Sequence, residues 1–170
     1  MKNLGPSGIK WLKIIHLLFV GLWIGSSFSI LFLIIFLQFS GLKEVYGFYL
    51  GIKLVDDFAI IPGAVGAMLT GMVYGIWTKW GFFRHNWLTV KWILNIALMI
   101  TGIFLLGPAV NANTALAESK RLAALASDQF MSNQQMLIIL GSVQFILLLF
   151  MLYVSTFKPW KKRKSKTLPS

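Results

Sequence analysis

Residues 14–42 read IIHLLFVGLWIGSSFSILFLIIFLQFSGL and contain no aspartate, glutamate, lysine or arginine. A helix needs about 20 apolar residues to cross the hydrocarbon core of a bilayer, and this stretch exceeds that length. Such a run indicates a transmembrane helix, which we expect over about residues 11–38. We also expect it to be retained, because the apolar core of a cleaved signal peptide has only about 7–15 residues.

Three further stretches lack the same four residue types: residues 58–78, 92–117 and 129–157. The helices expected within or around them cover about 58–78, 88–110 and 134–157. The strands of a membrane barrel would instead be about ten residues long with alternating apolar positions, a pattern that is absent here. The chain is 57% hydrophobic and 12% charged, whereas soluble domains have about 25% charged residues. The sequence therefore predicts a single all-α domain over residues 1–170, a bundle of four transmembrane helices.

The basic residues are concentrated on one side of the predicted membrane. Four spans place both termini on the same side, together with the connection at 79–91. Twelve of the sixteen Lys and Arg residues fall there: Lys2, Lys10, Lys13, Lys79, Arg84, Lys91, Lys158, Lys161, Lys162, Arg163, Lys164 and Lys166. Cytoplasmic segments of inner-membrane proteins are enriched in Lys and Arg. We therefore expect a protein of the bacterial inner (plasma) membrane with both termini in the cytoplasm, including a basic tail at 158–170.

The net charge of +11 does not indicate nucleic acid as a partner, because the cations form short clusters between long apolar runs. In the tail they would instead attract anionic lipid headgroups, at about 1 kcal/mol per residue. The chain has no cysteine, which excludes disulfides, thiolate metal sites and the covalent attachment of c-type haem. There is also no phosphate-binding glycine loop and no His-Glu-x-x-His helix, so we expect neither an ATPase nor a zinc hydrolase.

The connections on the other side of the membrane differ in character. Residues 39–57 are short and mixed, and they end with Asp56 and Asp57, which we interpret as acidic N-terminal residues of the second helix. Gln144 lies near the middle of the fourth span, where its amide needs an interhelical partner. We interpret it as structural.

Residues 114–130 have leucine and alanine at nearly helical spacing. This pattern predicts a helix on the outer membrane surface, capped by Thr114 or by Asn113. A continuation of the third helix past Pro108 is the alternative.

Small residues recur at every fourth position in two of the spans: Gly63, Ala67, Gly71 and Gly75 in the second, and Gly21 and Gly25 in the first. Such ridges allow helix backbones to approach closely in lipid. They predict a compact bundle, with the face of a homo-oligomer as the alternative.

His16 is a titratable residue inside the first span, and groups of this kind are candidates for function because they are costly in lipid. It begins a helical stripe that continues through Val20, Trp23 and Ser27. At 1.5 Å rise per residue, a similar depth is reached in the other spans by Met72, Tyr74, Lys91, Asn95, Met151 and Tyr153. His85 falls in the turn just below.

Histidine paired with a second histidine or with methionine is a known axial pair of low-spin haem. The convergence at one depth therefore suggests haem iron ligated by His16, with His85 or Met72 opposite. A histidine that only hydrogen-bonds at the interface is the alternative. Lys91 either neutralises a haem propionate or an anionic substrate, or extends to the cytoplasmic surface.

The segment Lys10-Trp-Leu-Lys-Ile-Ile-His16-Leu-Leu-Phe-Val-Gly-Leu-Trp23-Ile-Gly25 resembles the first helix of a group of small bacterial membrane proteins. The group includes the CopD-type copper-resistance domain, the HemJ-type protoporphyrinogen oxidases and uncharacterised four-helix relatives. Trp87-Leu-Thr-Val-Lys91-Trp is similar to a later helix start of the HemJ type, and Pro62-Gly63 with Leu69-Thr70-Gly71 resembles the uncharacterised relatives. The resemblance implies haem b with His16 as a ligand. Phe36-Leu37-Gln38-Phe39 stands where further polar residues, including a histidine, would be expected, so the oxidase reaction stays open.

Three hypotheses follow for the function. The first is a haem b membrane protein for electron transfer or haem-linked redox chemistry, with a quinone or another redox partner and with a haem-dependent oxidoreductase as the enzyme class. The second is a metal or small-solute transport protein. The third is a structural or accessory membrane protein without a cofactor.

Overall fold

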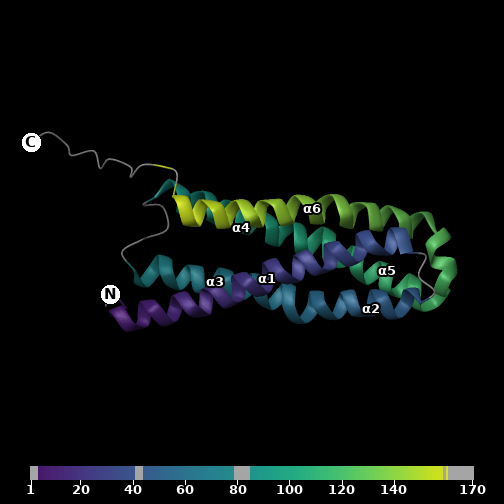
Figure 1. The fold of residues 1–170 in the computed structure, drawn as a ribbon, viewed down its shortest axis with the longest axis horizontal. Coiled ribbons are helices and arrows are strands. Elements are labelled where there is room, and N and C mark those ends of the chain that lie inside the picture. Colours follow the sequence, from purple (N-terminus) through teal and green to yellow (C-terminus); the bar gives the residue numbers. More distant parts are fainter. Residues whose placement is uncertain (1–3, 41–43, 79–84, 159, 161–170) are drawn as a thin grey trace, which may run out of the picture.

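The computed structural model of the chain describes residues 4–40, 44–78, 85–158 and 160, without the side chains of 37–40. Its helices form four long segments: α1 (Pro6–Ser40), α2 (Val45–Val55) with α3 (Ile61–Trp77), α4 (Asn86–Thr101) with α5 (Gly107–Lys120), and α6 (Asp128–Phe157). The segments lie side by side in an elongated bundle, with the first residues of α1 and the last residues of α6 at the same end (Figure 1). The prediction of an all-α bundle with four long apolar helices is confirmed.

Apolar side chains cover the outside of this bundle. Each of the four segments is long and apolar enough to cross a membrane. Phe58 is 75% exposed and Phe104 is 69% exposed, and many leucine, isoleucine and phenylalanine side chains are exposed around them. An exposed apolar surface of this extent is unfavourable in water and matches the hydrocarbon of a bilayer. The outer surface of the fold is therefore that of a membrane protein.

The second segment begins earlier than the sequence analysis predicted. Helix α2 starts at Val45 after Glu44, whose Oε1 accepts a hydrogen bond from the Gly47 N–H (3.2 Å). The prediction of a loop over residues 39–57 is therefore wrong from Val45 onward, where the chain is helical. The interpretation of Asp56 and Asp57 as N-terminal residues is also wrong, because both lie inside a continuous helical segment. The Lys53 ammonium donates a hydrogen bond to Asp57 Oδ2 (2.9 Å) on this segment.

A π-turn, η1 (Asp56–Ile60), joins α2 to α3. Pro62 has no N–H and would clash with the preceding turn of a regular α-helix. In the π-turn the Ile61 N–H donates to Asp56 O, five residues back, so the helix widens at this point instead of ending.

The third segment passes its proline in the same way. In η2 (Gly102–Leu106) the Gly107 N–H donates to Gly102 O, and α5 follows with Pro108 in its first turn. The alternative prediction, that the third helix continues past Pro108, is therefore correct. The separate surface helix predicted over residues 114–130 is not formed. Thr114 and Asn113 cap no helix, because both are buried inside α5. A 3₁₀ turn, η3 (Arg121–Ala126), then leads into α6.

The bundle is longer than a bilayer is thick. Helix α1 has 35 residues, which corresponds to about 52 Å at 1.5 Å per residue, whereas the hydrocarbon core measures about 30 Å. The half of the bundle away from the termini contains its own core from α1, α2, α5, η3 and α6, with Tyr49, Ile52 and Phe130 fully buried. A second core around Trp23, Leu98 and Leu148 lies nearer the termini.

Asn113 connects three elements in the core away from the termini. Its Nδ2 donates to Tyr49 Oη (3.2 Å) and to Phe130 O (3.2 Å), while its Oδ1 accepts from Asn133 Nδ2 (2.9 Å). The side chain is fully buried. Both Nδ2 protons and the Oδ1 atom are thus used to hold α2, α5 and α6 together.

We predict that Asn113→Leu destabilises the protein, because it leaves the Phe130 carbonyl and the Tyr49 hydroxyl buried without this partner. Each buried polar group left without a partner lowers the free energy of unfolding by about 1–3 kcal/mol. The measurement is thermal unfolding in detergent, followed by circular dichroism. Gln135→Leu on the exposed side of α6 is the control and should unfold with the parent. Equal midpoints for both variants would contradict the role assigned to Asn113.

The ridges of small residues divide into two groups. Gly63 and Ala67 are buried on α3, and Gly63 lies against the backbone of Trp23 in α1. The predicted close approach of helices is confirmed there. Gly21 and Gly25 are exposed, and a Cβ added at either would meet no atom within 4 Å. Within the described part of the chain, the ridge on α1 is therefore not used for packing.

Candidate functional site

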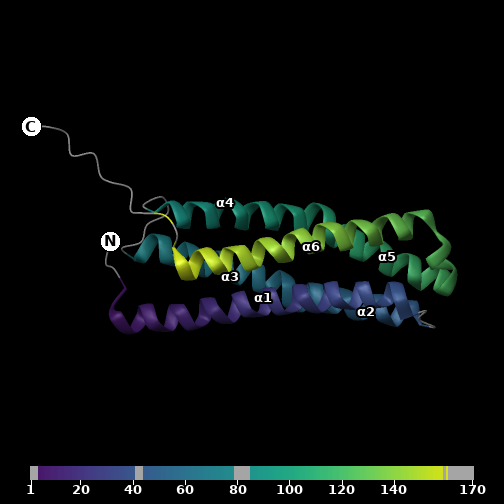
Figure 2. The same ribbon diagram turned by 45° about the horizontal axis from the view of Figure 1, so that its top comes forward.

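A cavity of about 370 Å³ opens near the end of the bundle where α1 begins and α6 ends. Its walls come from α1, α3, α4 and the end of α6, and Figure 2 shows these elements around that end of the molecule. The lining residues are Ile9, Lys13, His16, Leu17, Ala67, Met68, Gly71, Tyr74, Trp87, Leu88, Lys91, Trp92, Asn95, Ser155 and Lys158. In size the cavity falls within the range of about 300–1,000 Å³ that is typical of small-molecule sites.

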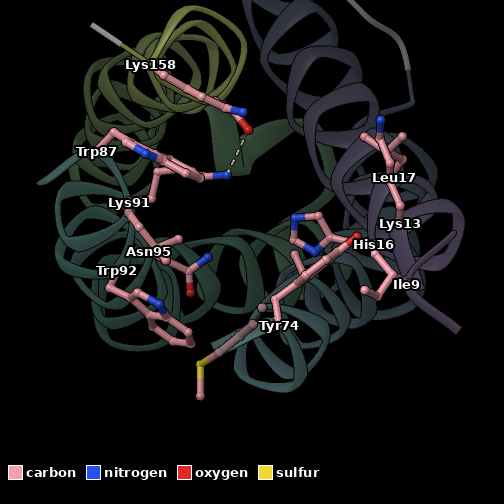
Figure 3. Close-up of a pocket in the computed structure, with 15 residues that line it drawn as sticks. Ile9, Lys13, His16, Leu17, Tyr74, Trp87, Lys91, Trp92, Asn95 and Lys158 are labelled. Atoms are coloured by element: carbon pink, nitrogen blue, oxygen red, sulfur yellow. Dashed lines mark hydrogen bonds between the residues drawn. The ribbon is translucent and has the colours of Figure 1, made fainter. Parts of the chain in front are cut away.

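His16 projects from α1 into this cavity (Figure 3). Its Nδ1 lies 2.7 Å from the hydroxyl oxygen of Thr70 on α3. That hydroxyl donates its single proton to a backbone carbonyl in its own helix, since its oxygen lies 2.6 Å from Gly66 O and 3.1 Å from Ala67 O. With its proton on one of these carbonyls, the Thr70 oxygen accepts from His16, an arrangement in which Nδ1 carries the proton and the lone pair of the neutral ring is on Nε2.

The position of His16 follows from the packing of α1 on α3. On α1, His16 and Trp23 are seven residues apart, which places them on one face of the helix, two turns from each other. On α3, Gly63 and Thr70 have the same separation and likewise share a face. The close contact of Gly63 with Trp23 brings the two backbones together and places Thr70 within reach of His16. The Tyr74 ring lies edge-on to the imidazole with 5.8 Å between centroids.

Two polar groups of α4 face His16 across the cavity. The Lys91 ammonium donates to Ser155 Oγ on α6 (3.2 Å), and its side chain extends into the cavity (Figure 3). Asn95 lies one turn further along the same face, and its Oδ1 is buried without a hydrogen-bond partner among the described residues. A ligand in the cavity would meet a cation and a free acceptor on this wall.

The charge of the cavity lining is entirely positive. Lys13, Lys91 and Lys158 line it, and no carboxylate lines it within the described part of the chain. Trp87 and Trp92 add aromatic surface on the α4 side. Lysines beside apolar and aromatic walls suit a ligand that is largely apolar and has acidic groups at one edge.

Of the four residues expected to hold a cofactor, two line the cavity and two do not. His16 and Lys91 line the cavity together, as depth matching indicated, and Tyr74 and Asn95 join them. His85 precedes α4 and its ring stacks on Trp87 (6.1 Å between centroids), whereas Met72 lies on α3 away from the lining. The methionine of α3 that does line the cavity is Met68, one turn away from Met72.

Several site residues were missed by the sequence analysis. Thr70 was noted only as part of a resembling motif, although its hydroxyl forms a hydrogen bond with His16 Nδ1. Ser155 gave no signal, because an isolated serine in an apolar helix is common. Lys13 was counted for orientation, and its place three residues before His16, on nearly the same helix face, was the available signal.

The described residues contain no group of three or more His, Cys, Asp or Glu side chains that could hold a metal ion. Among the described residues, His16 is the one histidine that lines the cavity. Comparisons with family models, with curated proteins and with solved structures found no match for this chain. The resemblance to CopD-type and HemJ-type proteins accordingly stays a prediction.

Proposed function

We propose that this protein binds haem b in the His16 cavity, within the inner (plasma) membrane, and serves electron transfer or haem-linked redox chemistry. The observation that carries the proposal is the hydrogen bond from His16 Nδ1 to Thr70 Oγ1. Histidines that ligate metals usually donate their second ring nitrogen to a fixed acceptor in this way, which orients the ring and its lone pair.

The residues of the cavity fit this group on three counts. A porphyrin supplies four nitrogen ligands of its own, so one axial histidine is sufficient where no cluster of ligands exists. Lys13, Lys91 and Lys158 would pair with the two propionates, and the tryptophans would lie against the apolar ring. When bound, haem supplies a centre for one-electron transfer.

The protein's contribution is to hold and orient this centre. His16 would supply a nitrogen that holds the iron, with Thr70 fixing its ring. Met68, which lines the cavity, is better placed than Met72 to contact the bound group, and His85 lies outside the lining and would not hold it. The redox partner would be a quinone or another electron carrier reaching the cavity from the lipid or from its open end.

The excess of basic residues beside both termini supports the orientation with the termini in the cytoplasm. In that orientation the cavity opens toward the cytoplasmic leaflet. Gly21 and Gly25 support a possible homo-oligomer, because their open space would allow a helix of a second copy to approach closely.

The experiment that tests the proposal is an absorption spectrum of detergent-purified protein, expressed with a haem precursor, before and after reduction by dithionite. A Soret band with sharpened α and β bands on reduction is the expected result. A well-folded, haem-supplied preparation without visible absorption would contradict it and favour the accessory or transport hypotheses.

We predict that Lys91→Gln weakens haem binding by about tenfold or more, because a hydrogen bond to a charged group contributes about 1.5–3 kcal/mol. The measurement is a titration of haem-free protein with haem. Lys10→Gln is the matched control, since it removes the same charge from an exposed position outside the cavity. Equal losses in both variants would indicate a general electrostatic effect and would remove Lys91 from the site.

A further inference from the structure

A second, smaller cavity of about 90 Å³ continues from the first toward the middle of the bundle. The two share His16, Lys91, Asn95 and Ser155 in their linings. The smaller one reaches Trp23, two turns beyond His16 on α1, and Leu148 and Met151 of α6. It is therefore an inward extension of the candidate site.

Polar atoms without partners lie along this extension and beyond it. Trp23 Nε1, Asn95 Oδ1, Ser27 Oγ and Gln144 Oε1 are buried, and within the described part of the chain none of them has a hydrogen-bond partner. Trp23 is 2% exposed and Gln144 is 5% exposed. Leaving one such group unsatisfied costs about 1–3 kcal/mol. Groups of this kind in protein interiors are usually hydrogen-bonded to ordered water.

These atoms follow one another along the axis of the bundle. Ser27 lies one helical turn beyond Trp23 on α1. Helices α1 and α6 run antiparallel, as the contacts of Phe28 with Phe145 (5.6 Å between centroids) and of Leu31 with Gly141 show. This register places Gln144 at the depth of Ser27. The unsatisfied groups thus extend from the candidate site past the middle of the bundle.

We propose that a water-filled passage leads from the His16 cavity through the smaller cavity to Ser27 and Gln144. At about 30 Å³ per molecule, the smaller cavity has room for about three waters. They would accept from Trp23 Nε1–H and donate to Asn95 Oδ1. The waters beyond would reach Ser27 and Gln144, and such a chain is what proton transfer to a buried site requires. The passage does not depend on which ligand fills the larger cavity.

The absence of cysteine from the chain allows a direct test. Ser27→Cys introduces a single thiol on the proposed passage, and Ser29→Cys places one at nearly the same depth on the exposed, lipid-facing side of α1. Both variants are reconstituted in phospholipid vesicles and treated with a small, water-soluble anionic methanethiosulfonate, because the entrance of the passage is lined by lysines. Because the reactive thiolate forms only where water solvates it, we expect Ser27→Cys to react at least about tenfold faster than Ser29→Cys.

A second pair repeats the comparison on another helix, so that the test survives if one variant does not fold. Gln144→Cys should react faster than Val143→Cys, which is exposed to lipid. Adding Asn95→Leu, which fills the smaller cavity with an apolar side chain, should slow the labelling of Ser27→Cys. Slow labelling at both Ser27→Cys and Gln144→Cys, or labelling that Asn95→Leu leaves unchanged, would overturn the passage.

Discussion

His16→Ala is expected to abolish the visible absorption of the haem-supplied protein, including the Soret band. The substitution removes the nitrogen that faces the cavity, and within the described lining no second histidine stands near it. Without the His16 nitrogen, retention of haem would rest on Met68, the lysines and the apolar walls. The measurement is the ratio of Soret to protein absorbance after purification, for variant and parent at equal haem supply.

The chain provides its own control for this experiment, because it has two histidines. His85→Ala removes a ring that stacks on Trp87 outside the cavity, and it should keep the spectrum of the parent. Thr70→Val keeps His16 but removes the acceptor of its Nδ1 proton. Loss of such a supporting partner typically costs 10–100-fold in metal affinity, so we expect weakened binding with an altered Soret position. Loss of the spectrum in His85→Ala but not in His16→Ala would show that the ligand was assigned to the wrong histidine.

The number of spans was predictable from the sequence, because the cost of a charge in hydrocarbon confines charged residues to the ends of helices. The ends of the helices were less predictable. Pro62 and Pro108 mark a break in a regular α-helix, and only the π-turns before them show that both helices continue. Inside α5, Asn113 and Thr114 have tertiary partners on Tyr49 that override their preference for helix caps.

For the candidate site, the depth of each residue in the membrane was predictable from the sequence, but the direction of its side chain was not. Depth follows directly from the helical rise, so the sequence placed Lys91, Asn95 and Tyr74 at the level of His16. The direction of each side chain depends on the rotation of its helix, which no span prediction supplies. Met72 and Met68 differ by one turn, and the structure places Met68 in the lining. The hydrogen bond of His16 to Thr70 needs the exact separation of α1 and α3, which is a property of their packing.

The packing of α1 on α3 leads to a prediction that links stability to the candidate site, Gly63→Ala. A Cβ at this position would lie 2.8 Å from the backbone nitrogen of Trp23 and 3.0 Å from its Cα. A side chain could turn away, but a backbone in the middle of a helix cannot, so the two helices would have to separate. Overpacking of this kind costs about 1–3 kcal/mol or more. It should exceed the gain of up to about 1 kcal/mol that alanine brings over glycine in a helix.

Gly25→Ala provides the matched comparison, because a Cβ there meets no atom within 4 Å. Its effect should be neutral or slightly stabilising, since the helix propensity is gained without a collision. Thermal unfolding of both variants in the same detergent measures the difference directly. Gly63→Ala should also lower the Soret absorbance of the haem-supplied protein. Separating α1 from α3 lengthens the hydrogen bond between His16 and Thr70, which lies two turns away. A Gly63→Ala protein that is as stable as Gly25→Ala would mean that α1 and α3 are not in contact at Trp23, and the orientation of His16 would then lose its structural basis.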